Sequence, residues 1–204
     1  MLVSLALTLA ALGLFLAFRH AGWVFLCAVC ALFTLFTAYF FRDPEREVPA
    51  GPGLIVSPAD GRIIEIAEEN NDFMGGRARR ISIFLNVFNV HVNRMPCDGS
   101  VAMVRYCPGK FLAAWDEKAS LDNEQTHVGL VCGDRKFLVK QIAGLIARRV
   151  VCRAKEGVAY RRGERFGMIK FGSRTDLFLP LDAKVQVAVG DKVRGGTSVL
   201  AVLP

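Results

Sequence analysis

Two long apolar runs open the chain, separated by a short polar break. Residues 1–18 are almost wholly apolar, Arg19 and His20 interrupt, and residues 23–41 are apolar again. Each run is about long enough to cross the hydrocarbon core of a bilayer as a helix. The pattern predicts a hydrophobic anchor of one or two helices over residues 1–41, which either forms a hairpin through the membrane or dips into one leaflet.

A secretory signal peptide is the alternative interpretation of the first run. The run lacks a positively charged beginning and an obvious small-residue cleavage site, and a second apolar run follows it directly. Arg42 and Arg46 come soon after the second run, which favours the cytoplasmic side for the remainder of the chain. We therefore expect a protein of the cell membrane whose larger part faces the cytoplasm.

Alternation of apolar and polar residues replaces the apolar runs after a linker rich in proline and glycine, residues 42–53. Strand-like runs flank the turn signal Asp60-Gly61, and similar runs recur to the end of the chain. A short helix is expected over residues 113–118. Residues 184–201 alternate around a Gly-Asp turn, as in the half-barrels of lipoyl and biotinyl carrier domains. The prediction is a mostly β (α+β), barrel-sandwich-like domain over residues 54–204.

Charge and cysteine usage narrow the class of partner. The net charge is +7, and arginines form three local clusters: Arg77, Arg79 and Arg80; Arg148, Arg149 and Arg153; and Arg161, Arg162 and Arg165. With an anchor present, a membrane surface with anionic lipid explains these clusters more economically than nucleic acid, since no nucleic-acid-binding module is recognisable. Cys27 and Cys30 lie in the second apolar run, where we expect them to pack, and the four later cysteines lack metal-ligand spacing. The three histidines are far apart, so we expect a reduced domain and no metal site.

A glycine–serine step, Gly172-Ser173, stands between two strongly apolar strand-like runs. The common interpretation of such a step is a β-turn. A second interpretation makes the Gly172–Ser173 peptide bond itself the reacting group. Glycine tolerates a strained backbone and leaves its carbonyl open to attack, and the Ser173 hydroxyl lies close to that carbonyl. The local sequence does not decide between the two.

Two upstream residues are candidates for acid–base chemistry. His91 lies in an alternating stretch, residues 88–96, and as part of a strand it would share one face with Asn89 and Asn93 and line a polar cleft. A lone histidine is more often structural. Asp60 has the same ambiguity, because a turn carboxylate commonly bonds its own backbone.

Five pieces, in order, carry a resemblance to a known family. They are Phe41-Arg42-Asp43-Pro44, Ser57-Pro58-Ala59-Asp60-Gly61, Phe84-Leu85-Asn86 through His91 to Arg94-Met95-Pro96, Asn123-Glu124, and Phe171-Gly172-Ser173-Arg174. Together they resemble the phosphatidylserine decarboxylase proenzymes, specifically the short bacterial and archaeal-type class, over about residues 40–204. Each piece is weak alone, whereas five in this order and spacing are specific.

The resemblance implies self-cleavage between Gly172 and Ser173. Ser173 would attack the Gly172 carbonyl and end as an N-terminal pyruvoyl group, a covalent cofactor. Residues 1–172 and 173–204 would then form a heterodimer of a large and a small chain. The pyruvoyl carbonyl would serve as the electron sink for decarboxylation of phosphatidylserine to phosphatidylethanolamine, so no external cofactor is implied.

The resemblance also implies roles for Asp60 and His91. His91 would take the Ser173 proton with Asp60 orienting the ring, and would later deliver a proton to the substrate carbanion. Longer members carry Asp-Tyr-His-x-x-His-x-Pro where this chain has Asn89-Val90-His91-Val92-Asn93-Arg94-Met95-Pro96. Only the first histidine is kept, so a division of labour between two cannot be transferred. Arg174 is either a ligand of the lipid phosphate or a surface arginine.

Two further functions stay open on the sequence alone. One is a membrane-tethered module that binds anionic lipid or a partner without catalysis, which would be seen as an unbroken chain. The other is a pyruvoyl decarboxylase of a soluble amino acid, which would prefer a water-soluble substrate to lipid. The sequence specifies neither the acyl-chain preference nor whether the chain forms a homo-oligomer.

Overall fold

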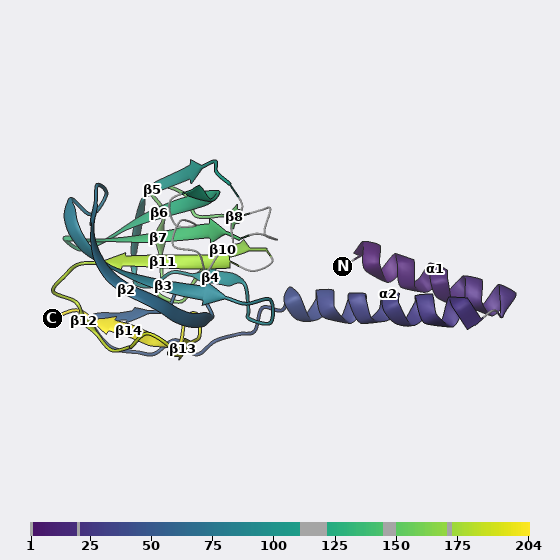
Figure 1. Ribbon diagram of the computed structural model, residues 1–204. Coiled ribbons are helices and arrows are strands. Elements are labelled where there is room, and N and C mark those ends of the chain that lie inside the picture. The colour runs from purple at the N-terminus through teal and green to yellow at the C-terminus, as the bar shows by residue number, and fades with distance from the viewer. Residues whose placement is uncertain (1, 20, 111–121, 145–149, 171–172) are drawn as a thin grey trace. The chain divides into compact units, whose positions relative to one another are not determined.

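Two compact units, Met1–Asp43 and Pro44–Pro204, make up the chain in the computed structural model (Figure 1). The structure describes all residues except 1, 20, 111–121, 145–149 and 171–172. The short helix expected over residues 113–118 and the Gly172 side of the predicted cleavage step therefore lie outside the described residues. Residues 44–53, expected to be a linker, belong to the second unit by their contacts.

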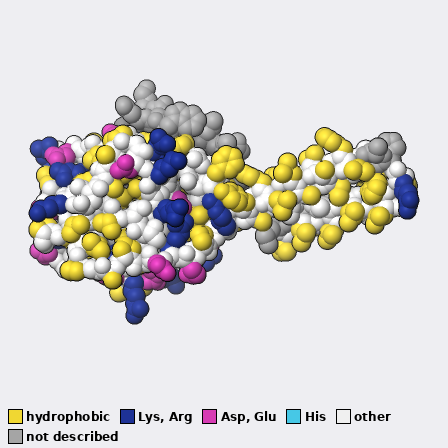
Figure 2. Space-filling model, turned by 90° about the horizontal axis from the view of Figure 1, so that it is seen from below, with side chains coloured by type: hydrophobic (Ala, Val, Ile, Leu, Met, Phe, Trp, Pro, Cys, Tyr) yellow, Lys and Arg dark blue, Asp and Glu magenta, His cyan; other side chains and the backbone are white. Residues whose placement is uncertain are grey.

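The first unit is a pair of apolar helices, α1 (Leu2–Phe18) and α2 (Ala21–Phe40). The two helices contact each other, with the Thr8 and Thr34 hydroxyl oxygens 3.1 Å apart. Figure 2 shows hydrophobic side chains over most of this unit's visible surface. Residues 22–40 form a helix long and apolar enough to cross a membrane, with a mean hydropathy of 2.1. The sequence predicted one or two apolar helices here, and the structure has two.

The second unit is built from antiparallel strands. Those among the described residues are β1 (Leu54–Val56), β2 (Gly61–Asn71), β3 (Gly76–Leu85), β4 (Val92–Arg94), β5 (Gly99–Cys107), β6 (Gln125–Cys132), β7 (Arg135–Ala143), β8 (Val150–Cys152), β9 (Ala159–Tyr160), β10 (Arg165–Ile169), β11 (Ser173–Leu179), β12 (Lys184–Val185), β13 (Lys192–Val193) and β14 (Val199–Val202). They form a curled eight-stranded sheet, β13-β2-β3-β11-β7-β6-β5-β9, and two three-stranded sheets, β1-β14-β12 and β4-β10-β8 (Figure 1). The expectation of a mostly β domain is confirmed.

Strand β11 occupies an interior position in the large sheet, between β3 and β7. All of its residues are buried, and its side chains alternate between two covered faces. Leu177 and Leu179 join the main core, whereas Phe178 packs on the opposite face with Ala78 and Leu138. Ser173 and Thr175 therefore share the core face, because they stand at the same parity as Leu177.

The alternating stretch around His91 is only partly a strand, because β4 begins at Val92. Residues 86–89 form a turn closed by asparagine side chains. Asn86 N donates to Asn89 Oδ1 at 2.9 Å, and Phe88 N donates to Asn86 Oδ1 at 2.9 Å. Asparagine side chains compete with sheet pairing by bonding nearby backbone in this way. The strand that would have placed His91 on one face with Asn89 therefore does not extend over residues 88–91.

Candidate active site

Ser173 opens β11 with its side chain on the core face. Its backbone is fixed on both sides, opposite Leu85 of β3 and Ala143 of β7. The residue is 0% exposed, and its hydroxyl oxygen has no hydrogen-bond partner among the described residues. A buried hydroxyl without a partner costs about 1–3 kcal/mol, so its presence calls for an explanation. A rigid backbone and an unengaged hydroxyl are what a nucleophile at this position needs.

A chain of buried polar side chains lies beside Ser173 on the core face. Asn93 of β4 donates to the Thr175 hydroxyl oxygen at 3.2 Å, and Gln141 of β7 donates to Asn93 Oδ1 at 2.8 Å. All three side chains belong to fully buried residues. The sequence identified Asn93 as a cleft residue but missed Thr175 and Gln141. The available signal was Gln141, a polar residue that stands at the same strand parity as the apolar Phe137 and Val139.

His91 is fully buried and comes directly before β4. Its Nδ1 lies 2.9 Å from the carbonyl oxygen of Asn89. A carbonyl only accepts, so Nδ1 carries the hydrogen and Nε2 is the basic nitrogen of the neutral ring. The His91 carbonyl accepts from Ile169 N at 3.2 Å, which fastens His91 to the end of β10, four residues before Ser173.

Asp60 has both carboxylate oxygens engaged. Oδ1 accepts from Gly195 N at 2.7 Å, and Oδ2 accepts from Arg46 at 2.9 Å. Gly61 fits directly after it because an added Cβ would come within 2.3 Å of the Phe84 carbonyl oxygen. The structure directs Asp60 to Arg46 and Gly195, and the group that orients His91 through Nδ1 is the backbone of Asn89.

A pocket of about 700 Å³ opens beside Asp60. The turn that holds the His91 ring contributes Asn86 and Asn89 to its wall. The remaining lining combines Phe84 and Val193 with three basic residues, Arg62, Lys192 and Arg194. A mixed apolar and cationic lining of this kind suits a small anionic headgroup.

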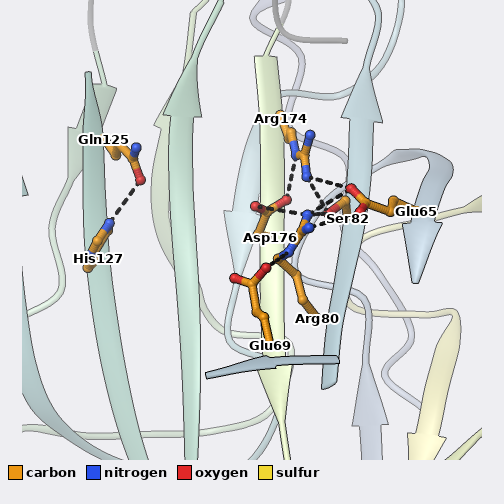
Figure 3. Close-up of polar contacts among 8 residues, drawn as sticks. All are labelled: Glu65, Glu69, Arg80, Ser82, Gln125, His127, Arg174 and Asp176. Atoms are coloured by element: carbon orange, nitrogen blue, oxygen red, sulfur yellow. Dashed lines mark hydrogen bonds and ion pairs between the residues drawn. The ribbon is translucent and has the colours of Figure 1, made fainter. Parts of the chain in front are cut away.

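Arg174 points away from Ser173, into a buried charge network on the opposite face of β11 (Figure 3). It is 1% exposed, and it donates to Asp176 at 2.7 Å, Ser82 at 2.7 Å and Glu65 at 3.2 Å. Neither alternative for Arg174 holds, because it is not a surface residue and these contacts engage its guanidinium away from Ser173.

Arg80 extends the network on the same face. It bonds Glu65 at 2.9 Å and Glu69 at 3.0 Å, and it lies 3.8 Å from Asp176. Burial of the Glu65 carboxyl opposes its ionisation, but the hydrogen bonds and charges of Arg80 and Arg174 outweigh that effect and lower its pKa. The two arginines therefore keep the Glu65 carboxylate ionised at neutral pH.

A second histidine, His127, is half-buried and lies on this outer face rather than at the site (Figure 3). Its Nε2 is 2.9 Å from Gln125 Oε1. Burial first, and then the positive charges of Lys140 and Arg105, lower the pKa of His127 to about 4, so the ring is neutral at physiological pH. His127 provides a natural comparison for His91.

Arg174→Gln is expected to lower the free energy of unfolding by about 3 kcal/mol, because it leaves Asp176 buried with only part of its compensating charge. Arg77→Gln is the matched control. It removes an ion pair with Glu68 in which the Arg77 side chain is 64% exposed, and it should cost under about 1 kcal/mol. Urea unfolding of the full chain in detergent, followed by circular dichroism, measures both. Equal losses of unfolding free energy in the two variants would contradict a structural role for Arg174 in the buried charge network.

The free energy of unfolding measured in this way should also depend on pH. The pKa of Glu65 is lower in the folded state, so the unfolded state binds more protons and stability rises with pH through the acid range. This contribution is present above the ordinary value of 4.5 and is lost as the pH falls through the folded-state pKa. Arg174→Gln should weaken that dependence, whereas Arg77→Gln should leave the Glu65 contribution in place.

Comparisons with known proteins agree with one another. The phosphatidylserine decarboxylase family model matches residues 33–201. A phosphatidylserine decarboxylase proenzyme of Symbiobacterium thermophilum is 50% identical over 198 residues, which cover 96% of this chain and 91% of that protein. The corresponding proenzyme of Oleidesulfovibrio alaskensis is 51% identical over 87% of this chain and 82% of its own length. The proenzyme of Syntrophus aciditrophicus is 48% identical over 90% of this chain and 86% of its own length.

Proposed function

Because this chain belongs to the phosphatidylserine decarboxylase family, we propose that Ser173 is the residue that cuts the chain and becomes its pyruvoyl group. Proenzymes of this family process themselves into a large and a small chain and convert phosphatidylserine to phosphatidylethanolamine with a serine-derived pyruvoyl group. The observation that carries the assignment to Ser173 is its fully buried hydroxyl at the start of β11, which lacks a partner in the described part of the chain.

Self-cleavage follows from the position of this hydroxyl. Ser173 Oγ attacks the Gly172 carbonyl carbon, so the peptide C–N bond is exchanged for an ester C–O bond. Loss of the Ser173 α-proton then expels the Gly172 carboxylate and leaves a dehydroalanine, which water converts to the pyruvoyl carbonyl with release of ammonia. Pairing of Ser173 with β3 and β7 supports this route, because it fixes the backbone that carries the nucleophile.

His91 is the base we assign to the first step. Its Nδ1 is committed to the Asn89 carbonyl, which leaves Nε2 to accept the Ser173 proton. The same nitrogen can return a proton to the substrate α-carbon after carbon dioxide has left. The hydrogen bond from Ile169 supports this role, since it ties His91 to the segment that leads into the cleavage step.

Asp60 belongs to the substrate pocket in this proposal. The pyruvoyl carbonyl supplies the electron sink that loss of the carboxylate requires. The Asp60 carboxylate attracts the substrate ammonium group and can take its proton, and Arg62 and Arg194 pair with the phosphate or carboxylate of the headgroup. Gly195 N and Arg46 hold Asp60 in place for this task.

We assign residues 1–41 to a membrane anchor, 42–53 to a linker and 54–204 to a catalytic domain of barrel-sandwich type on the cytoplasmic side of the cell membrane. The length and hydropathy of α2 support the anchor, and the arginines that follow α2 support the cytoplasmic side. The lipoyl-like alternation of residues 184–201 supports the fold type. A surface with anionic lipid is the expected partner.

Intact mass spectrometry of the purified protein tests this function. We expect two chains, residues 1–172 and 173–204, the smaller one lighter than a serine-initiated peptide by the mass of ammonia. Carbon dioxide should be released from phosphatidylserine in mixed micelles and not from free serine. A single unbroken chain with an intact Ser173 in active protein would overturn the assignment, and preference for free serine would indicate a soluble substrate.

A further inference from the structure

The first residues after the helical unit form a strap, residues 44–48, that lies against the β unit. Arg94 of β4 donates to the Pro44 carbonyl at 3.0 Å, and Arg165 of β10 pairs with Glu45 at 2.7 Å. The strap is therefore fastened to the small sheet formed by β4, β10 and β8.

A pocket of about 510 Å³ is formed by the strap and the residues around the start of β10. Two glutamates of its lining, Glu45 and Glu164, stand against five arginines: Arg46, Arg94, Arg161, Arg162 and Arg165. Positive charge exceeds negative charge in this lining, so the pocket is suited to an anion.

Two of these arginines, Arg161 and Arg162, can offer hydrogen-bond donors and positive charge to a ligand. Arg162 donates to the carbonyl oxygens of Gly51 and Leu54, each at 3.0 Å, and neither contact neutralises its charge. Its buried Nε has no hydrogen-bond partner within the described ranges. The Arg161 residue is exposed at the pocket. Guanidinium groups present paired donors that match the oxygens of a phosphate group.

The position of the strap in the chain indicates the source of the phosphate. Arg46 lies six positions after Phe40, where α2 ends, and six fully extended steps reach about 20 Å at most. Basic groups that close to a membrane-inserted helix meet the anionic headgroup layer. We propose that this pocket binds the phosphate of an anionic membrane phospholipid, at a site separate from the substrate pocket beside Asp60. This rests on the proposed membrane attachment.

The test titrates the full chain, in neutral detergent micelles, with dihexanoyl phosphatidylglycerol by calorimetry. This lipid has no amine and so is not decarboxylated. Arg161→Gln/Arg165→Gln should weaken binding at least tenfold. The matched double variant Arg77→Gln/Lys136→Gln removes the same charge from another surface and should stay within twofold. Absence of binding by the wild type, or equal weakening in both variants, would overturn the proposal.

Two further measurements distinguish a lipid phosphate from the free ion and provide a second variant in case the double variant does not fold. Dihexanoyl phosphatidylcholine should bind at least tenfold more weakly, and equal affinity for inorganic phosphate would reject the lipid in favour of the free ion. Arg161→Glu, a change at an exposed position, should weaken binding at least as strongly as the double variant and serves if that variant unfolds. Self-cleavage is read separately by mass, so loss of cleavage with retained binding affects only the proposed function.

Discussion

Ser173→Ala is expected to yield a folded, uncut chain of 204 residues with no decarboxylase activity. Alanine retains the backbone pairing with β3 and β7 but removes the only atom that can attack the Gly172 carbonyl from this residue. Losing a buried hydroxyl that has no described partner should not reduce stability, because no hydrogen bond is broken. A denaturing gel and intact mass spectrometry measure the result.

Ser82→Ala provides the matched control for this variant. Ser82 is equally buried, on the neighbouring strand β3, but its hydroxyl faces the opposite side of the sheet and accepts from Arg80 and Arg174. This variant should be less stable and should still cut itself. A Ser173→Ala chain that splits at the same bond would end the assignment.

His91→Gln should slow self-cleavage by about 10²–10⁴-fold, the usual contribution of a positioned general base. Glutamine has no basic nitrogen at the position of Nε2, so only weaker bases would be left to deprotonate the Ser173 hydroxyl. Appearance of the small chain with time after synthesis gives the rate. His127→Gln removes a half-buried ring on the outer face and should leave the rate within about twofold.

The two catalytic steps can be separated in the same variant. Slow self-cleavage followed by full decarboxylase turnover would confine His91 to self-cleavage. If self-cleavage and decarboxylation are both slow, the result would support a role for His91 in both reactions. Normal cleavage together with full turnover would show that another group is the base.

The sequence predicted the apolar helices and the mostly β unit because both depend on local periodicity. Residues 1–41 are apolar apart from the break at Arg19 and His20, and the strands of the second unit alternate. Periodicity failed at residues 88–91, where asparagine side chains close a turn that mimics alternation. Hydrogen bonds from asparagine side chains to nearby backbone competed with strand pairing there. An alternating sequence does not show which of the two forms.

The candidate site was predictable as a set of residues but not as a geometry. Strand parity places Ser173 and Arg174 on opposite faces, yet only the fold shows that the Arg174 face carries Glu65 and Asp176. The contact of Gln141 with Asn93 depends on how β7 meets β4, and the contact of Arg46 with Asp60 depends on where the strap lies. Such pairings are set by long-range register, which no short window contains.

The interior position of β11 affects how the mature, two-chain enzyme unfolds and refolds. A cut at the proposed Gly172–Ser173 bond would leave β11 to β14 on residues 173–204, and these strands pair with β1, β2, β3 and β7 of residues 1–172. After the cut, these strands are held only by non-covalent contacts, and an unfolding event releases two separate polypeptides. Refolding then requires a bimolecular encounter and slows on dilution. The active form is therefore preserved by a barrier to unfolding, having been assembled once as a single chain.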